Sequence, residues 1–380
     1  MLRLASSGKL LTCGSKPKVT QDIKEERKNG EVMNGRIGVI GHFGAGGKFC
    51  DGQTVKTKNL TDLLEGKGGF SVYRVDTAYV KTNKLRLLLE TIICLIRCRH
   101  VFLMVSGNGM KFYLPFLYFV NRFTRCRIYH YIIGSSLLTL VEEDPRLIRY
   151  MNALSVNWFE YESGTDILRR KGVKNMETLV NFKLIHPVEQ ALEYSDTEGV
   201  FRFCMFSRVM EEKGVTQAIE AVAAINAKSG RKTVCLDIYG PVELEYRMKF
   251  EQLLSDHSDC VCYRGIADSE KSVEVLKVYY ALLFPTRYAG EGVPGTVIDA
   301  FAAGLPIIAS DWNANRELIE DGVQGIVYPC CRAKTLQEAI EWAVAQPDEM
   351  MRMRTAARAE YKRFMPEIVL DAIRGKMEEK

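Results

Sequence analysis

Residues 284–311, FPTRYAGEGVPGTVIDAFAAGLPIIASD, constrain the fold of this chain more than any other segment. Short apolar runs at 281–284 and 306–309 predict buried strands on either side of a central loop and helix. The loop, 290–295, is rich in glycine, and the run that follows it, 296–303, predicts a helix. A strand, a loop, a helix and a second strand in this order indicate one unit of a parallel α/β sheet.

Two acidic residues belong to the same segment, Glu291 in the loop and Asp299 in the predicted helix. Glycines let a ligand approach the backbone closely, and a helix N-terminus offers free N–H groups and a positive dipole. This combination suits a ligand that is both anionic and rich in hydroxyl groups. A nucleotide sugar is such a ligand.

A second motif, SRVMEEKG at 207–214, follows the predicted strand 200–206 and precedes the predicted helix 215–228. Arg208 and Lys213 therefore bracket a loop at the carboxyl edge of a sheet, where doubly wound folds bind ligands. Two cations there could neutralise a diphosphate and stabilise it as a leaving group. An Arg and a Lys five residues apart are usually only solvated, but Glu291 and Asp299 in the same domain favour the functional interpretation.

Length and patterning predict two Rossmann-like α/β domains. We expect a disordered leader at 1–35, a first domain at 36–183, a linker at 184–199, a second domain at 200–348 and a C-terminal helical segment at 349–380. No apolar run approaches the roughly 20 residues that cross a bilayer. Eleven cysteines without a C-x-x-C pair, and five scattered histidines, predict no metal site and a reducing cytosol.

Charge is divided unevenly between the two halves. Residues 1–183 hold 29 Lys and Arg against 16 Asp and Glu, whereas residues 184–380 hold 23 against 31. Two apolar stretches with basic ends, 84–99 and 111–127, lie in the basic half. They predict core helices of the first domain, and a part of each is expected to rest on an anionic membrane surface.

The motifs SRVMEEKG, EGVPGTVID, GLPIIASD and ELIEDGVQG together resemble glycosyltransferase family 4, whose members are retaining enzymes of the GT-B fold. This resemblance implies that the two Rossmann-like domains face each other across a cleft and that the C-terminal helix at 349–380 crosses back to the first domain. The signature of that family is two acidic residues separated by seven others, here Glu291 and Asp299. Aspartate replaces the usual glutamate at the second position, and Pro294 stands where many members carry glycine. The runs GGKFCDGQTVKTKNL, YHYIIGSS and LVNFK resemble bacterial members that build capsule and exopolysaccharide.

The resemblance implies a role for each matching residue. Arg208 and Lys213 would hold the donor diphosphate, Glu291 the donor sugar beside its anomeric carbon, and Asp299 the ribose. The remaining implied contacts are the backbone N–H groups of Gly295 and Thr296 with donor phosphate or sugar, His130 with the donor sugar, and Gly46 and Gly47 with donor or acceptor. A buried histidine at the edge of a strand is the alternative interpretation of His130.

These observations predict a retaining, metal-independent transferase that moves a sugar, from UDP by default, to a lipid-linked saccharide in capsule or exopolysaccharide synthesis. We expect a cytoplasmic protein peripheral to the inner face of the cell membrane, with no cofactor and no nucleic-acid partner. A soluble or protein acceptor and a non-catalytic nucleotide-sugar-binding subunit remain alternatives. A dinucleotide oxidoreductase fits less well, because the first glycine loop, Gly44, Gly46 and Gly47, does not match G-x-G-x-x-G.

Overall fold

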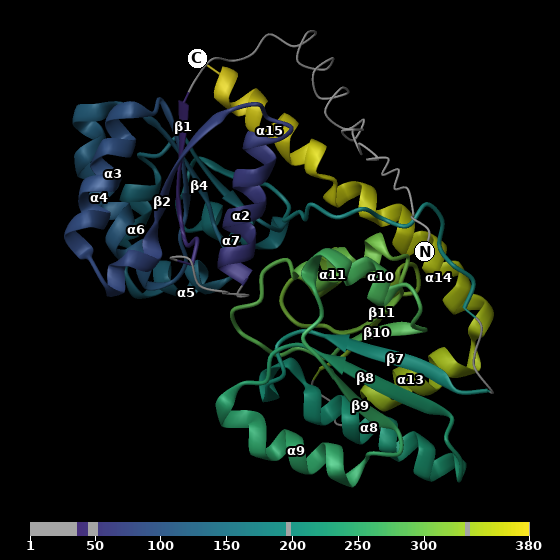
Figure 1. Ribbon diagram of the computed structural model, residues 1–380. Coiled ribbons are helices and arrows are strands. Elements are labelled where there is room, and N and C mark those ends of the chain that lie inside the picture. The colour runs from purple at the N-terminus through teal and green to yellow at the C-terminus, as the bar shows by residue number, and fades with distance from the viewer. Residues whose placement is uncertain (1–35, 45–51, 195–198, 331–334, 380) are drawn as a thin grey trace, which may run out of the picture. The chain divides into compact units, whose positions relative to one another are not determined.

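A computed structural model describes residues 36–44, 52–194, 199–330 and 335–379. The predictions for Gly46 and Gly47, and for the leader 1–35, therefore lie outside the described residues. Within these ranges the chain forms two sheets of six parallel strands with helices on their faces, which confirms the predicted α/β class with two doubly wound domains (Figure 1).

The first sheet has the strand order β2-β1-β3-β4-β5-β6. Each strand pairs in parallel with its neighbours, so all six carboxyl ends lie at one edge. The strands are β1 (Arg36–Gly41), β2 (Ser71–Asp76), β3 (His100–Met104), β4 (Arg127–Tyr131), β5 (Val156–Phe159) and β6 (Met176–Thr178). The inner strands β1, β3, β4 and β5 are buried along almost their whole length, as is typical of strands that are covered on both faces.

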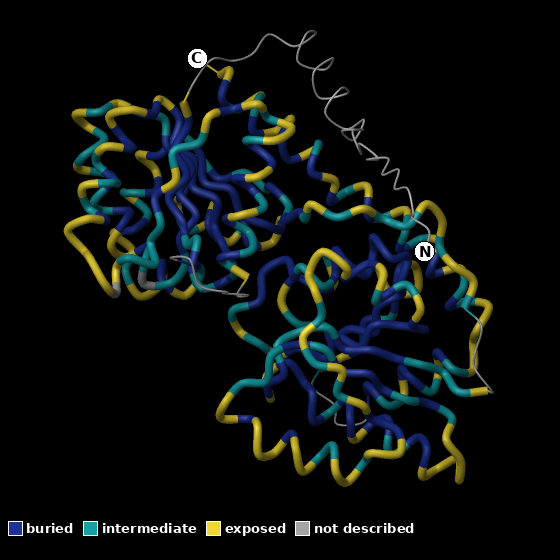
Figure 2. Tube along the Cα trace, viewed as in Figure 1, coloured by how far each residue is buried: buried dark blue, intermediate teal, exposed yellow. Residues whose placement is uncertain are grey.

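The second sheet has the order β12-β11-β10-β7-β8-β9, again with parallel pairing throughout. Its strands are β7 (Phe201–Phe206), β8 (Val234–Tyr239), β9 (Val261–Gly265), β10 (Ala281–Phe284), β11 (Ile307–Ser310) and β12 (Gly325–Tyr328). Figure 2 shows the strands of both sheets as mostly buried. The central strands β10 and β11 are buried along their whole length.

Helices cover both faces of the first sheet. One face packs against α2 (Gly52–Glu65) and α15 (Pro366–Glu378), through side chains such as Leu60 and Val369. The opposite face packs against the remaining helices of this domain, which contribute Leu87, Leu117 and Leu140 to its core. These helices are η1 (Thr77–Lys81), α3 (Lys84–Arg97), α4 (Asn108–Thr124), α5 (Ser136–Glu143), α6 (Arg146–Met151) and α7 (Glu162–Arg170).

The second sheet is covered in the same way. Ile219, Phe250 and Ile340 lie on one side of it, and Phe301 and Ala357 on the other. The helices of this half are η2 (Glu211–Lys213), α8 (Val215–Ser229), η3 (Leu244–Tyr246), α9 (Arg247–Asp256), η4 (Ser269–Lys271), α10 (Ser272–Leu276), α11 (Gly295–Ala302), α12 (Asn315–Leu318), α13 (Thr335–Ala345), α14 (Pro347–Glu360) and η5 (Tyr361–Phe364).

Some helices end or begin at other residues than expected, because of the backbone conformation or a proline at those positions. The helix expected at 111–127 ends at Thr124, because Arg125 takes a left-handed conformation with φ of 54° and β4 begins at Arg127. The C-terminal helix expected at 349–380 is instead divided into α14, η5 and α15. Prolines stand at the first positions of α14 and α15, where the missing N–H costs nothing.

No helix of the described residues combines the length and the apolar character that crossing a membrane requires. The described part of the linker, before residue 195, contains neither helix nor strand. Arg354 of α14 holds this segment in place, since its buried guanidinium donates to the carbonyl oxygens of Leu192 and Tyr279, at 2.8 and 2.7 Å.

Candidate functional site

Residues of both domains line one cavity of about 680 Å³. The second domain contributes the turns that follow β7, β8 and β9 and the first turns of α11. Carboxyl ends of parallel strands and the start of a helix are the places where doubly wound domains bind ligands. The lining residues include Lys56, Asn59, Asn181, Lys183, Phe206, Ser207, Arg208, Tyr239, Gly240, Ile266, Asp268, Ser269, Gly295, Thr296 and Asp299.

The glycine loop is held from the first domain. The backbone N–H of Val293 donates to the Glu160 carboxylate at 2.9 Å, and its carbonyl accepts from the Asn181 amide at 2.9 Å. Glu160 is buried and also pairs with Lys56 of α2. A Cβ at Gly292 would lie 2.2 Å from the Glu160 carboxylate, so a side chain at this position would displace Glu160 from its contacts. Two segments far apart in sequence thus fix the shape of this loop.

Glu291 forms a buried ion pair with Lys213. Its carboxylate also accepts a hydrogen bond from the Thr286 hydroxyl at 3.0 Å. The Lys213 ammonium lies 5.1 Å from the ring centre of Tyr288 and 5.8 Å from that of Phe284. Aromatic faces and a carboxylate together compensate a cation that is withdrawn from water. Glu291, which was expected to bind the donor sugar, and Lys213, which was expected to bind the diphosphate, therefore form one ion pair.

Arg208 lies on the wall of the cavity. Its guanidinium pairs with Glu243 at 2.7 Å and stacks over the Tyr288 ring, 5.0 Å from the ring centre. The side chain keeps 39% of its surface exposed, so the cation remains accessible from the cavity. Arg208 and Lys213 share Tyr288 as a neighbour. Arg208 lines the cavity, whereas Lys213 and Glu291 are not among its lining residues.

Asp299 is buried in α11, and both of its carboxylate oxygens accept from the Lys183 ammonium at 2.6 Å. The Ser272 hydroxyl donates to the same carboxylate at 2.8 Å. Burial raises the pKa of Asp299, while the Lys183 ammonium and the Ser272 hydroxyl oppose that rise. Contact with a ribose would require Asp299 to share these partners, so the ribose role inferred from the resemblance stays a prediction.

Gly295 and Thr296 form the first turn of α11, and both line the cavity. Pro294 precedes them and carries no N–H, so the first donors of this helix belong to Gly295 and Thr296. The Thr296 hydroxyl is buried and has no hydrogen-bond partner among the described residues. A buried hydroxyl without a partner beside a cavity indicates a position where a polar ligand is accommodated.

His130 lies inside β4, with 0% of its surface exposed, and does not line the cavity. One ring nitrogen, Nδ1, lies 3.0 Å from the amide oxygen of Asn157, whereas Nε2 is buried without a partner among the described residues. Burial lowers the pKa of His130 to about 4, so the ring is neutral near pH 7. A contact between His130 and a donor sugar stays a prediction.

Four residues of the site were not anticipated as functional: Lys56, Glu160, Lys183 and Ser272. A charged residue directly after an apolar strand, as Glu160 follows β5, is the signal that would have found one of them. Lys183 ends the run LVNFK, which was noted only as a resemblance. Lys56 belongs to the run GGKFCDGQTVKTKNL, which was likewise noted only as a resemblance. Ser272 carries no sequence signal, because its relevance depends on Asp299, 27 residues away in the chain.

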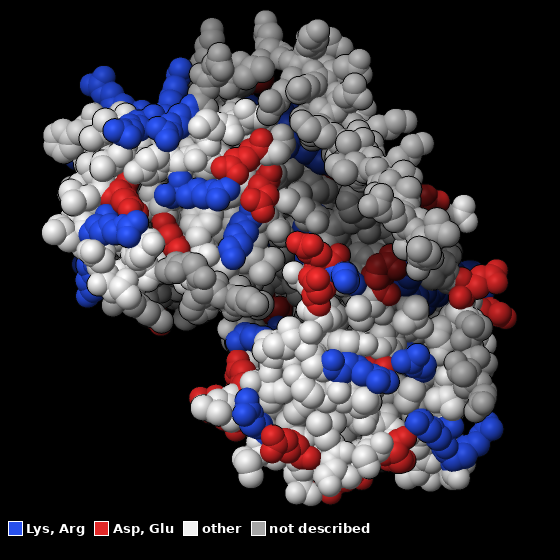
Figure 3. Space-filling model, in the orientation of Figure 1, with Lys and Arg blue, Asp and Glu red and all other residues white. Residues whose placement is uncertain are grey.

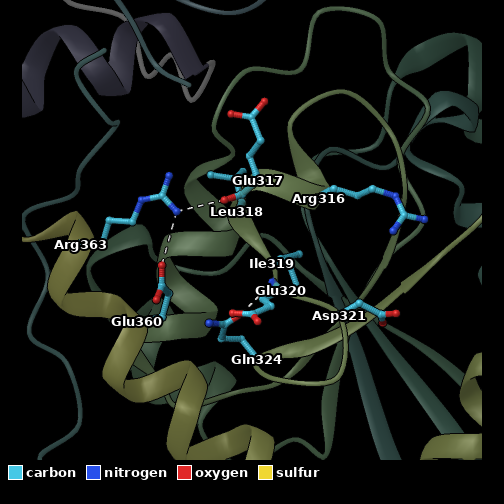
Figure 4. A pocket seen from close by; sticks show the side chains of 9 residues that line it. All are labelled: Arg316, Glu317, Leu318, Ile319, Glu320, Asp321, Gln324, Glu360 and Arg363. Carbon is cyan, nitrogen blue, oxygen red and sulfur yellow. Dashed lines mark hydrogen bonds and ion pairs between the residues drawn. The ribbon is translucent and has the colours of Figure 1, made fainter. Parts of the chain in front are cut away.

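A different cavity, of about 470 Å³, lies beside α12 and η5 (Figure 4). It contains none of the predicted site residues. Arg363 donates to the carbonyl oxygen of Glu317 at 3.0 Å, while the Glu317 carboxylate accepts the N–H groups of Glu162 and Ser163 at 3.0 and 3.2 Å. The carboxylate thus caps the N-terminus of α7, which is a stabilising structural role. No group of three His, Cys, Asp or Glu suited to a metal ion occurs within the described residues.

Residues 193–360 match the family described as glycosyl transferases group 1. An uncharacterised glycosyltransferase of Methanocaldococcus jannaschii is 23% identical over 231 residues, which cover 56% of this chain and 58% of that protein. The amylovoran biosynthesis glycosyltransferase AmsK of Erwinia amylovora is 31% identical over 132 residues, which cover 34% and 32%. The chain thus spans between about a third and three fifths of the length of these relatives.

Among solved structures, HepE of Anabaena in complex with UDP and glucose superposes with a TM-score of 0.69 at 13% identity, over 90% of this chain and 99% of that one. This likeness shows the fold, which is GT-B. The matched segment 193–360 contains Arg208, Lys213, Glu291 and Asp299. The chain therefore has a GT-B fold, and its segment 193–360 is similar to the glycosyl transferases of group 1.

Proposed function

We propose that this protein is a retaining, metal-independent glycosyltransferase of family 4. It moves a sugar from a nucleotide-sugar donor, by default a UDP-sugar, to a lipid-linked saccharide in capsular or exopolysaccharide synthesis at the cytoplasmic face of the cell membrane. The family match of the second domain, the amylovoran biosynthesis relative and the UDP and glucose bound by HepE support this proposal.

One observation carries the proposal furthest, namely the cavity at the first turn of α11. The N–H groups and positive dipole of a helix N-terminus bind phosphate, and here the Thr296 hydroxyl and the Arg208 guanidinium add two further donors. An ammonium has three donors, so Lys213 can contact a phosphate oxygen while it remains paired with Glu291. These groups stabilise the negative charge that the diphosphate gains as it leaves.

The proposed reaction needs no protein nucleophile. The acceptor hydroxyl oxygen forms a bond to the anomeric carbon on the face from which the diphosphate departs, and the bond between that carbon and the phosphate oxygen breaks. The departing phosphate oxygen accepts the proton of the acceptor hydroxyl, so charge and atoms balance. Glu291 would position the sugar beside this carbon, and the configuration of the donor would be retained.

A screen of nucleotide sugars tests the proposal. We expect one UDP-sugar to raise the melting temperature and to be hydrolysed slowly without acceptor, with release of UDP. Thr296→Val and Arg208→Gln should each weaken donor binding about tenfold, as expected for the loss of one hydrogen bond to a charged group. The matched controls Thr82→Val and Arg352→Gln change exposed residues and should leave binding unchanged.

Donor binding without any transfer or hydrolysis would instead identify a nucleotide-sugar-binding subunit. Binding of no nucleotide sugar would overturn the proposal. Once an acceptor is found, the anomeric configuration of the product, measured by NMR, tests retention. Turnover in the presence of EDTA tests metal independence.

A further inference from the structure

Apolar side chains lie exposed along α3 and α4 of the first domain. Leu85 and Ile96 keep 68% and 69% of their surface exposed, and Phe123 keeps 88%. The full set comprises Leu85, Leu89, Ile93 and Ile96 of α3 and Phe112, Phe119 and Phe123 of α4. A helix on the surface of a globular domain normally turns polar residues to the solvent, so these two helices depart from the usual pattern.

The spacing places the exposed residues in one stripe on each helix. They recur every three or four residues in α3, and in α4 the half-buried Phe116 completes the same spacing. Phe116 stacks on Phe112 with ring centres 5.7 Å apart. Other residues of both helices, among them Leu87 and Leu117, are buried in the core. Each helix therefore has two apolar sides. One side packs into the core of the domain, and the other is exposed.

Positive charge surrounds these stripes. Residues 84–127 contain eight Lys and Arg and one acidic residue, Glu90, which pairs with Arg86. Arg97, Arg99 and Arg122 are exposed, and among the described residues none of them has an ion-pair partner. Figure 3 shows Lys and Arg side chains, with Asp and Glu side chains among them, on the part of the first domain where Figure 1 places α3 and α4. The cations stand at the ends of the helices and the apolar residues between them.

We propose that this surface, the α3–α4 face, docks on an anionic lipid bilayer. Apolar side chains enter the boundary between headgroups and acyl chains, while Arg and Lys contact lipid phosphates. Both helices then lie in the interface, and neither crosses the bilayer. The proposal stands independently of sugar transfer, since it rests on exposure and charge in the first domain alone.

Charge complementarity selects this occupant over a second copy of the chain. A symmetric dimer through the same face would bring the arginines of one copy close to those of the other, with Glu90 already paired. Like charges in such a contact are destabilising. An anionic bilayer instead supplies apolar volume and negative charge in the same layer.

Co-sedimentation of the full chain with vesicles tests the proposal. We expect binding to phosphatidylcholine vesicles that contain phosphatidylglycerol, weaker binding at high salt, and much weaker binding to phosphatidylcholine alone. Phe119→Ser/Phe123→Ser should reduce the affinity about tenfold or more, and Arg97→Gln/Arg122→Gln about fivefold for each charge. Leu244→Ser/Met248→Ser, at positions 75% and 78% exposed in the second domain, is the matched control and should bind like the unchanged chain.

The melting temperature of each variant checks that the fold is kept, which is expected because all the changed side chains are exposed. Equal binding to neutral and anionic vesicles would overturn the proposal, and so would unchanged binding of Phe119→Ser/Phe123→Ser. A dimer in solution that the same phenylalanine variant dissociates would show that a second copy, not lipid, covers this face.

Discussion

The two domains share one architecture but contribute to the candidate site by different routes. The second domain supplies turns that directly follow strands and the first turns of a helix, which bring Arg208 and Thr296 to the cavity. The first domain supplies Lys56 from the side of a helix and Lys183 from the segment after its last strand. His130, which is the predicted site residue on a strand of the first domain, is fully buried inside the sheet.

This difference shows what each domain does at the site. In the second domain, the groups that line the cavity are part of the local strand–loop–helix structure. In the first domain, Glu160 and Asn181 hold the backbone of Val293, and Lys183 holds Asp299. The first domain therefore acts on the ligand site mainly through the glycine loop and α11. Three changes, described from the largest expected effect to the smallest, test this division.

Breaking the Lys183–Asp299 pair should have the largest effect. In Lys183→Met the Asp299 carboxylate stays buried without its cation, and we expect the free energy of unfolding to fall by about 3–4 kcal/mol at pH 7. A buried Asp299 without its cation can take up a proton, so the loss of unfolding free energy cannot exceed the cost of that protonation. This cost is about 1.36 kcal/mol for each unit by which the pH exceeds the ordinary pKa of aspartate. It should therefore shrink to about 1.5 kcal/mol at pH 5. Denaturant unfolding at the two pH values measures both quantities.

The double variant Lys183→Met/Asp299→Asn removes both charges and should recover most of the loss. Lys228→Met is the matched control, because its pair with Glu341 leaves the lysine 70% exposed and contributes at most about 1 kcal/mol. A loss as small as that of the control would mean that Lys183 does not hold α11, and the proposed division between the domains would fail.

Changing the Lys213–Glu291 pair should affect turnover rather than binding. We expect Lys213→Ala and Glu291→Gln each to lower turnover about 10²–10³-fold, because in the proposed reaction the pair would stabilise the charge that develops as the diphosphate leaves. The two losses should not add in the double variant, since the residues act together. The measurement is sugar transfer or donor hydrolysis by variants with matched melting temperatures. Unchanged rates in both single variants would remove this pair from the proposed mechanism.

His130 should show its effect in the pH dependence of stability. Its pKa is lowered to about 4 by burial, so between that value and its ordinary pKa of 6.5 the unfolded chain binds more protons than the folded one. The stabilising contribution is complete above pH 6.5 and is lost as the pH falls towards 4. At pH 5 this loss amounts to about 2 kcal/mol.

In His130→Gln the difference in unfolding free energy between pH 7.5 and pH 5 should therefore be smaller by that amount, measured with urea. Turnover of the same variant examines the role inferred from the family resemblance. A loss of about 100-fold in turnover, together with an unchanged pH dependence of the unfolding free energy, would indicate that His130 contacts the substrate. The proposed difference between the two domains would then be wrong.

Much of the fold was predictable from sequence, because buried parallel strands appear as short apolar runs. The strand Ala281–Phe284 has the predicted bounds, and the strands predicted at 200–206 and 306–309 are found at Phe201–Phe206 and Ile307–Ser310. Sequence also placed Glu291 and Asp299 on the glycine loop and α11, since both belong to one local motif. The partners of these acids were not predictable. Lys183 is 116 residues from Asp299, and only the folded chain shows that Lys213 pairs with Glu291 and that Lys183 pairs with Asp299.

The packing of α15 has a consequence for the order in which the molecule is completed during synthesis. Val369, Leu370 and Ile373 belong to the same core as Ile37 and Leu60, although the whole second domain separates them in sequence. A nascent chain that has left the ribosome only as far as Gln346 therefore carries a first domain with one sheet face partly uncovered. Exposed apolar surface of this kind makes an incomplete chain prone to aggregation. Of the two domains, the first therefore leaves the ribosome before the second, but its hydrophobic core is completed only after the second domain has been synthesised.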